Sequence, residues 1–146
     1  MDVYQVLMQD HRIVDELFNE IEKSDDREVE WREQLFARLR KELEAHTLIE
    51  EDIFYPWIEN LLGLKEFVEQ SFEEHAGFEA ILQEISEMRA NKDDWLEKID
   101  ELKDVVQRHV RMEEDKMFPP ARKELDESRA EELGRQILEM KQKARQ

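Results

Sequence analysis

Residues 46–56 read HTLIEEDIFYP, and residues 109–119 read HVRMEEDKMFP. Both stretches contain His-x-x-x-Glu-Glu-Asp and close on an aromatic residue followed by proline. Each is preceded in the chain by an acidic residue and a solitary histidine, Asp10-His11 and Glu74-His75. The chain therefore consists of two copies of a helix pair, and this repeat uses all four of its histidines.

Apolar residues recur at three- and four-residue steps in four segments, which is typical of helices with one buried stripe. The segments cover residues 3–21, 31–57, 64–88 and 95–117. Short connections favour antiparallel neighbours, so we predict an all-α fold, an up-down-up-down antiparallel four-helix bundle with a short C-terminal tail helix. We expect residues 1–146 to form one domain, with the bundle at about 1–121 and a tail helix at about 127–144 laid on its outside. Pro56 is expected to kink or end the second helix, and Gly134 weakens the prediction of the tail helix.

The composition excludes several classes of partner. Lys and Arg number 22 against 39 Asp and Glu, and the net charge of −17 repels phosphate backbones and anionic membrane surfaces. We therefore expect neither nucleic acid nor a membrane as a partner. Hydrophobic residues make up 40% of the chain, including seven Phe and three Trp, which argues against a disordered acidic chain. No apolar run is long enough for a membrane span and no leader peptide is evident, so a soluble cytoplasmic protein is expected.

The histidines fall on the apolar stripes, which predicts a metal centre. Residues four apart lie on one helix face, so His46 with Glu50, and His109 with Glu113, can each present a nitrogen and an oxygen to one point. Burying such groups is costly unless they are paired or bind a cation. The chain has no cysteine, so imidazole and carboxylate must supply the ligands. The competing interpretation is purely structural, since acidic residues are abundant, but the duplication of the whole block argues against it.

The order His, His-x-x-x-Glu, His, His-x-x-x-Glu, with the Glu-Glu doublets and Tyr55-Pro56 and Phe118-Pro119 after them, resembles the hemerythrin-like, or HHE cation-binding, domains. The resemblance covers about residues 1–121. It implies a non-haem centre of two iron ions, bridged by an oxo or hydroxo group, inside a four-helix bundle. The ligands that it implies are His11, His46, Glu50, His75, His109 and Glu113.

The sequence departs from the oxygen-carrying hemerythrins four residues after His75, where those proteins have a further histidine and this chain has Glu79. Because Glu79 shares the stripe of His75, we predict that it is a seventh metal ligand, and its negative charge disfavours reversible oxygen carriage.

Several nearby polar residues are given lesser roles. Asp15 is a candidate acceptor for an imidazole N–H. Glu51 and Glu114 are rotated about 100° from the ligands and are expected on the surface, with Glu114 an alternative ligand. Tyr4 and Tyr55 receive no role in the site.

The sequence thus predicts a hemerythrin-like di-iron protein that binds or senses dioxygen or a related small oxidant, acting as a binding module rather than a committed enzyme, and as a monomer. One alternative is a di-iron enzyme that reduces peroxide or nitric oxide. The other is a metal-free helical interaction protein that engages a partner through its tail helix.

Overall fold

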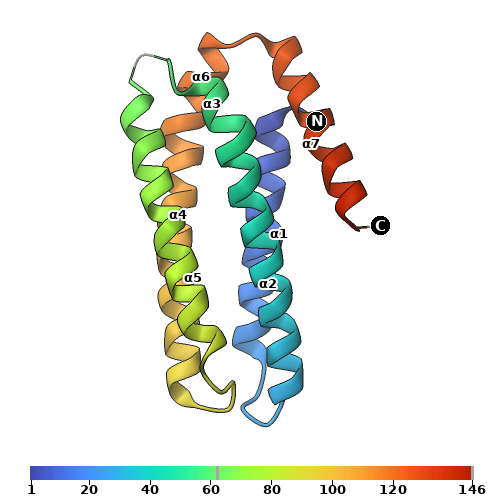
Figure 1. The fold of residues 1–146 in the computed structure, drawn as a ribbon, viewed down its shortest axis with the longest axis vertical. Coiled ribbons are helices and arrows are strands. Elements are labelled where there is room, and N and C mark those ends of the chain that lie inside the picture. Colours follow the sequence, from blue (N-terminus) through green and yellow to red (C-terminus); the bar gives the residue numbers. More distant parts are fainter. Residues whose placement is uncertain (62, 146) are drawn as a thin grey trace.

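The structure of the protein is a computed structural model that describes residues 1–61 and 63–145. These residues form helices and no strand, which confirms the predicted all-α class. Four long helices lie side by side, successive ones running in opposite directions, and a further helix packs on the outside (Figure 1). The elements are α1 (Val3–Lys23), α2 (Val29–Ile49), η1 (Glu50–Phe54), α3 (Tyr55–Ile58), α4 (Lys65–Ser86), α5 (Asp93–Met112), η2 (Glu113–Met117), α6 (Phe118–Glu124) and α7 (Glu127–Arg145).

Two apolar clusters fill the bundle, and the histidines lie where one gives way to the other. Along α1, Leu7 belongs to the cluster near the chain termini and Val14 to the cluster toward the far loops, with His11 between them. The same order holds on the other long helices. His46 lies between Leu43 and Ile49, His75 lies between Val68 and Phe78, and His109 lies between Val106 and Met117. The four imidazoles therefore form one layer across the bundle.

The elements η1 and η2 are π-helical turns, and each begins at a candidate ligand, Glu50 or Glu113. In both, the backbone N–H after the turn donates to the carbonyl five residues earlier, from Tyr55 to Glu50 and from Phe118 to Glu113. A proline is the second residue of each α-helical stretch that follows, Pro56 in α3 and Pro119 in α6. Proline has no N–H to continue the α-helical ladder, so the repeated proline marks where the wider turn is placed. Pro56 thus follows a change of helical register, where the sequence predicts a kink or an end.

Helix α7 extends along the outside of α1 and runs parallel to it (Figure 1). Its apolar residues Leu133 and Ile137 are buried in the cluster that includes Val3 and Leu7. Burial of a side chain of this size contributes roughly 1.5–3 kcal/mol. Gly134 is required for this approach, because a Cβ there would come within 2.7 Å of the Asp2 carbonyl carbon. The glycine that weakens the sequence prediction therefore permits the packing.

Candidate metal centre

Four imidazoles and two carboxylates from α1, α2, η1, α4, α5 and η2 meet inside the bundle. Each of these six side chains is at most 6% exposed. His11 Nε2 lies 3.1 Å from a Glu113 oxygen, and His46 Nε2 lies 3.2 Å from a Glu50 oxygen. His75 Nε2 lies 3.2 Å from the same Glu50 oxygen. The sequence spacing thus brings together the six residues that the repeat singles out.

The cluster contains two groups of atoms that match metal-ligand geometry. One consists of His11, His46, Glu50 and Glu113, and the other of Glu50, His75 and His109, with ligand atoms in each group within 4.8 Å of one another. Glu50 belongs to both groups. The second Glu113 oxygen lies 3.4 Å from His109 Nε2, so Glu113 also reaches both sides. Two cation positions bridged by carboxylates fit this arrangement, in which each position takes its two histidines from one half of the chain.

Each imidazole turns its Nδ1 away from the centre toward a carboxylate of a neighbouring helix. The distances are 2.6 Å from His11 to Glu114, 2.9 Å from His46 to Asp10, 2.8 Å from His75 to Glu51 and 3.4 Å from His109 to Glu74. A carboxylate accepts a hydrogen bond, so each Nδ1 carries a proton and each Nε2 is directed to the centre. Such outer carboxylates commonly orient the histidine ligands of metals.

This outer ring follows the internal repeat. Asp10 and Glu74 each precede a solitary histidine, whereas Glu51 and Glu114 each follow a candidate ligand. Glu51 and Glu114 are 31% and 35% exposed, so the prediction of surface charges holds only in part. Their rotation off the core stripe directs them into the seam between helices, where each contacts an imidazole Nδ1. Asp15 is not an imidazole partner, since its carboxylate accepts from Gln107 at 3.4 Å.

Tyr55 is a member of the cluster to which the sequence pattern assigns no role. Its hydroxyl donates to Glu113 at 2.5 Å and lies 3.1 Å from Glu50, with His75 Nε2 and His109 Nε2 at 3.3 and 3.4 Å. Residues five apart differ by about 140° around an α-helix, which would point Tyr55 away from Glu50. The wider π turn places both on one side. Only the proline after Tyr55, and its repeat after Phe118, signals this change of register.

Glu79 lies outside the cluster, which corrects the prediction of a seventh ligand. Its side chain is 51% exposed and pairs with Arg40 at 2.9 Å. The buried stripe of α4 passes through His75, Phe78 and Leu82, so Glu79 falls beside it. Because Glu79 is not part of the cluster, its charge gives no reason to expect that reversible oxygen carriage is disfavoured.

Without a metal, the cluster holds itself together as ion pairs. Burial alone would lower the pKa of His109, but the charge and hydrogen bond of Glu113, with Glu74 behind the ring, raise it to about 10. Burial is likewise outweighed at His46, where Glu50 and Asp10 raise the pKa well above its usual value. Burial would raise the pKa of Glu113, but His109 holds it well below the usual range. A cation must therefore displace protons from these imidazoles.

The hydrogen bonding of the cluster is incomplete at its centre. His11 Nε2 and His46 Nε2 lie at ion-pair distance from Glu113 and Glu50. These two nitrogens, one Glu50 oxygen and one Glu113 oxygen nevertheless form no hydrogen bond with any described residue. Unpartnered buried polar atoms are rare and costly in folded proteins. The nitrogens and carboxylate oxygens are ligand atoms suited to iron, manganese or zinc, so the donor set fits a metal pair.

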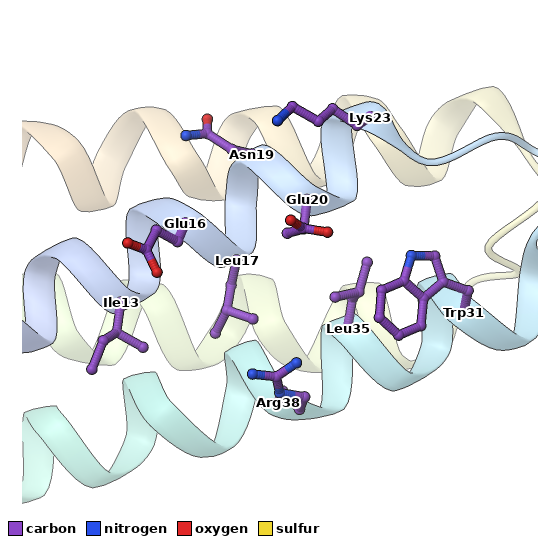
Figure 2. Close-up of a pocket in the computed structure, with 9 residues that line it drawn as sticks. All are labelled: Ile13, Glu16, Leu17, Asn19, Glu20, Lys23, Trp31, Leu35 and Arg38. Atoms are coloured by element: carbon purple, nitrogen blue, oxygen red, sulfur yellow. The ribbon is translucent and has the colours of Figure 1, made fainter.

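A small cavity adjoins the cluster on the side of the far loops. Its volume is about 10 Å³, and the four histidines line it together with the apolar residues Val14, Leu43, Phe78, Val106 and Val110 and with Thr47. A much larger surface cavity of about 460 Å³ lies between α1 and α2 (Figure 2). Its lining mixes Glu16 and Glu20 with Lys23 and Arg38 and includes none of the histidines. Of these two cavities, only the small one adjoins the histidines.

Comparisons with known proteins bear on this site. The family model described as hemerythrin HHE cation binding domain matches residues 2–121. An uncharacterized hemerythrin-like protein of Schizosaccharomyces pombe is 29% identical over 129 residues, which cover 86% of this chain and 62% of that protein. A Nostoc protein named DNA nickase is 26% identical over 146 residues, which cover 100% of this chain and 41% of that protein. The chain thus spans less than two thirds of either relative.

The fold has a counterpart among solved structures. A crystal structure of a hemerythrin HHE cation binding domain-containing protein from Mycobacterium kansasii has a TM-score of 0.86 to this chain, with 24% sequence identity. The match covers 98% of this chain and 86% of that one. It therefore includes most of α7 as well as the bundle.

Proposed function

Because the chain belongs to the hemerythrin HHE cation-binding domain family, we propose that it holds two iron ions in the His and Glu cluster and binds or senses dioxygen or a related small oxidant there. The observation that carries the proposal is the pair of overlapping ligand groups that share Glu50. Zinc does not change its oxidation state, whereas iron held by imidazole and carboxylate supplies the electrons that oxygen binding requires.

The proposed ligands have distinct roles. His11 and His46 would hold one ion and His75 and His109 the other, each through Nε2. Glu50 and Glu113 would bridge the two ions, because their oxygens lie near histidines of both groups. The carboxylates of the outer ring keep the protons on Nδ1 and thus leave Nε2 free to bind.

The cavity beside the cluster supports a small ligand. A space of about 10 Å³ is at the lower limit for one water molecule, so it excludes an organic substrate, and a diatomic or peroxide guest would enter only with a small movement of the lining side chains. Val14, Phe78 and Val106 give that guest an apolar surrounding and keep water sparse. Such a site binds a small, weakly polar molecule rather than an organic substrate.

Tyr55 favours a second candidate function, the reduction of peroxide or nitric oxide. Burial and the charges of Glu113 and Glu50 raise the pKa of Tyr55 well above its usual value, so its hydroxyl keeps its proton. Reduction of peroxide consumes protons, and this hydroxyl holds one within the cluster. Tyr55 would thus place a hydrogen-bond donor beside the oxygen atom on which negative charge develops as peroxide is reduced.

The nickase activity named for the Nostoc relative is not proposed for this chain. The chain covers 41% of that protein, and its net charge of −17 opposes contact with DNA phosphates.

The test combines metal analysis with absorption spectra. Protein from iron-replete cells should contain two iron ions per chain, and Glu50→Ala or Glu113→Ala should reduce this number. Glu79→Ala is the matched control, because it removes an exposed carboxylate outside the cluster, and it should keep both ions. Protein free of bound metal in all four preparations would overturn the proposal.

Exposure of the anaerobically reduced protein to air distinguishes the two functions. A spectral change that nitrogen reverses supports binding or sensing of dioxygen. Oxidation of the two ferrous ions by one equivalent of added peroxide, slowed in Tyr55→Phe at unchanged iron content, supports the reductase.

A further inference from the structure

Helix α7 lies beyond residues 2–121, where the family model matches, yet its buried stripe leads to the metal centre. The stripe consists of Ala130, Gly134, Ile137 and Lys141, at steps of three and four residues on one helix face. Gly134 lies against the backbone of Met1 and Asp2. Because α7 runs parallel to α1, two helical turns further on Lys141 reaches Asp10.

Lys141 completes a chain of contacts that ends at a candidate ligand. Its ammonium group pairs with one Asp10 oxygen, while the other Asp10 oxygen accepts the hydrogen bond of His46 Nδ1 at 2.9 Å. The Lys141 side chain is 15% exposed and the Asp10 side chain 5%. Both Asp10 oxygens therefore have fixed partners, and the carboxylate cannot turn away from the imidazole without losing one of them.

Within residues 1–61 and 63–145, no lysine pairs with the other three outer carboxylates. Glu74 is the counterpart of Asp10 in the internal repeat, and it is 29% exposed and receives its second hydrogen bond from the neutral amide of Gln70. Glu51 and Glu114 are 31% and 35% exposed. A charged partner that is itself mostly buried forms a stronger hydrogen bond than an amide or water does. The tail helix thus makes one half of the site unlike the other.

We propose that Lys141 is a positioning residue of the metal centre, which holds Asp10 against His46 Nδ1 so that docking of α7 sets how firmly His46 retains its ion. The inference rests on the proposed function and deepens it. It implies that the ion bound by His11 and His46 responds to the tail helix, whereas the ion bound by His75 and His109 does not.

The experiment compares metal release from the iron-loaded full chain of wild type, Lys141→Met, Lys141→Arg and Lys143→Met. Lys143→Met is the matched control, because it removes the same charge from an exposed position on the same helix. Release to excess EDTA is followed by absorbance and by iron analysis. Loss of an outer hydrogen-bond partner commonly weakens metal binding 10- to 100-fold. Because Lys141 reaches His46 only through Asp10, we expect an effect at the lower end of this range, with one release phase about tenfold faster in Lys141→Met.

The second release phase of Lys141→Met should match wild type, and Lys141→Arg should restore the wild-type rate of the first. Equal acceleration of both phases would mean that Lys141 only anchors the tail, and unchanged phases would mean that it does nothing. Either result overturns the proposal. Gly134→Leu provides a second test, because its side chain pushes α7 off Met1 and Asp2 while leaving Lys141 in the chain. It should reproduce the selective effect of Lys141→Met.

A readout on the metal-free protein separates this inference from the proposed function. In wild type and Lys143→Met, the His46 Nδ1–H resonance should be protected from exchange with water, and in Lys141→Met it should exchange at least several-fold faster. Wild type that binds no iron would overturn the proposed function, and the His46 resonance would still decide whether Lys141 positions the ring. Equal exchange in all variants would overturn the role of Lys141 even where two iron ions are bound.

Discussion

One hydroxyl group distinguishes the two halves of the metal centre. Tyr55 and Phe118 hold equivalent places in the repeat, and their rings lie over His75 and His11, with centroid distances of 5.6 and 6.3 Å. Only Tyr55 adds a donor, and that donor meets the Glu113 carboxylate. The two candidate ligand groups therefore share their residue types but differ in the aromatic ring that lies beside them.

Replacing Tyr55 by Phe tests this hydroxyl. A buried hydrogen bond to a charged acceptor contributes about 1.5–3 kcal/mol, so Tyr55→Phe should lower the free energy of unfolding of the metal-free protein by this amount. Urea unfolding measures the change. Tyr4→Phe is the control, because the Tyr4 hydroxyl is buried without a hydrogen-bond partner among the described residues, and its removal should be neutral or stabilising. An equal loss in both variants would contradict the assignment.

The outer ring gives a second prediction at this scale. Glu51→Gln and Glu114→Gln should each weaken iron binding 10- to 100-fold, because the amide no longer holds the proton on Nδ1 as firmly. Competition with a chelator of known affinity measures the change. Asp52→Asn removes one charge from an exposed neighbour and should leave the affinity unchanged. Unaltered affinity in both Gln variants would show that the ring does not orient the histidines.

Sequence spacing identified the inner residues of the site but not their surroundings. His46 and Glu50 share a helix face whatever surrounds them, so periodicity sufficed to pair them. The roles of Glu51 and Glu114 depend on which helices are neighbours, which periodicity within one helix does not specify. Glu79 was misassigned because a residue four after His75 lies only near the buried stripe, and the stripe passes instead through Phe78.

At the scale of the element, the π turns allow a ligand and its hydrogen-bond donor to share one short segment. Glu50 and Tyr55 are five residues apart and meet at 3.1 Å, which an unbroken α-helix would prevent. The register of α2 before the turn buries His46, and the register after it buries Phe54 and Tyr55. A π turn contains one residue more than an α-helical turn does, and this extra residue lets one helix contribute both to the site and to the apolar cluster near the chain termini.

Pro56→Ala tests how the turn is maintained. Alanine restores an N–H that can donate to the Asp52 carbonyl, so we expect the segment to relax toward α-helix and to turn Tyr55 away from Glu50. Iron release to EDTA should then be about tenfold faster, the effect of one lost outer hydrogen bond. Pro120→Ala should leave the rate unchanged, because Pro119 remains to define the second turn. Equal rates in both variants would mean that packing alone maintains the π turn.

At the scale of the whole molecule, the metal centre is a layer of opposite charges inside an acidic protein. The pKa of His109 rises to about 10 and those of His11 and His46 also rise, because Glu113 and Glu50 outweigh the effect of burial. Raised histidine pKa values stabilise the metal-free fold fully below their usual value near 6.5, and this contribution is lost as the pH climbs through the folded-state values.

The metal-free protein should therefore lose stability between pH 6.5 and about 10. At acidic pH the lowered pKa values of Glu113 and Asp10 matter instead, because their contribution to the free energy of unfolding is lost as the pH falls below about 4. Urea unfolding at pH 6, 8 and 10 measures the alkaline loss. The iron-loaded protein should change less over this range, since metal already occupies Nε2. Equal stability of the metal-free protein at pH 6 and 10 would contradict the ion-pair description.

The position of the histidine layer between two apolar clusters also bears on folding cooperativity. The cluster near the termini and the cluster near the far loops each have their own packed side chains, and each long helix passes from one to the other through a histidine. Without metal, the junction is a set of imperfectly bonded polar groups, and the two clusters can open as separate cooperative units. Backbone amide hydrogen exchange should then give two plateaus of protection for the metal-free protein. Bound metal takes ligands from helices that contribute to both clusters, so the iron-loaded protein should unfold as one cooperative unit with a single plateau.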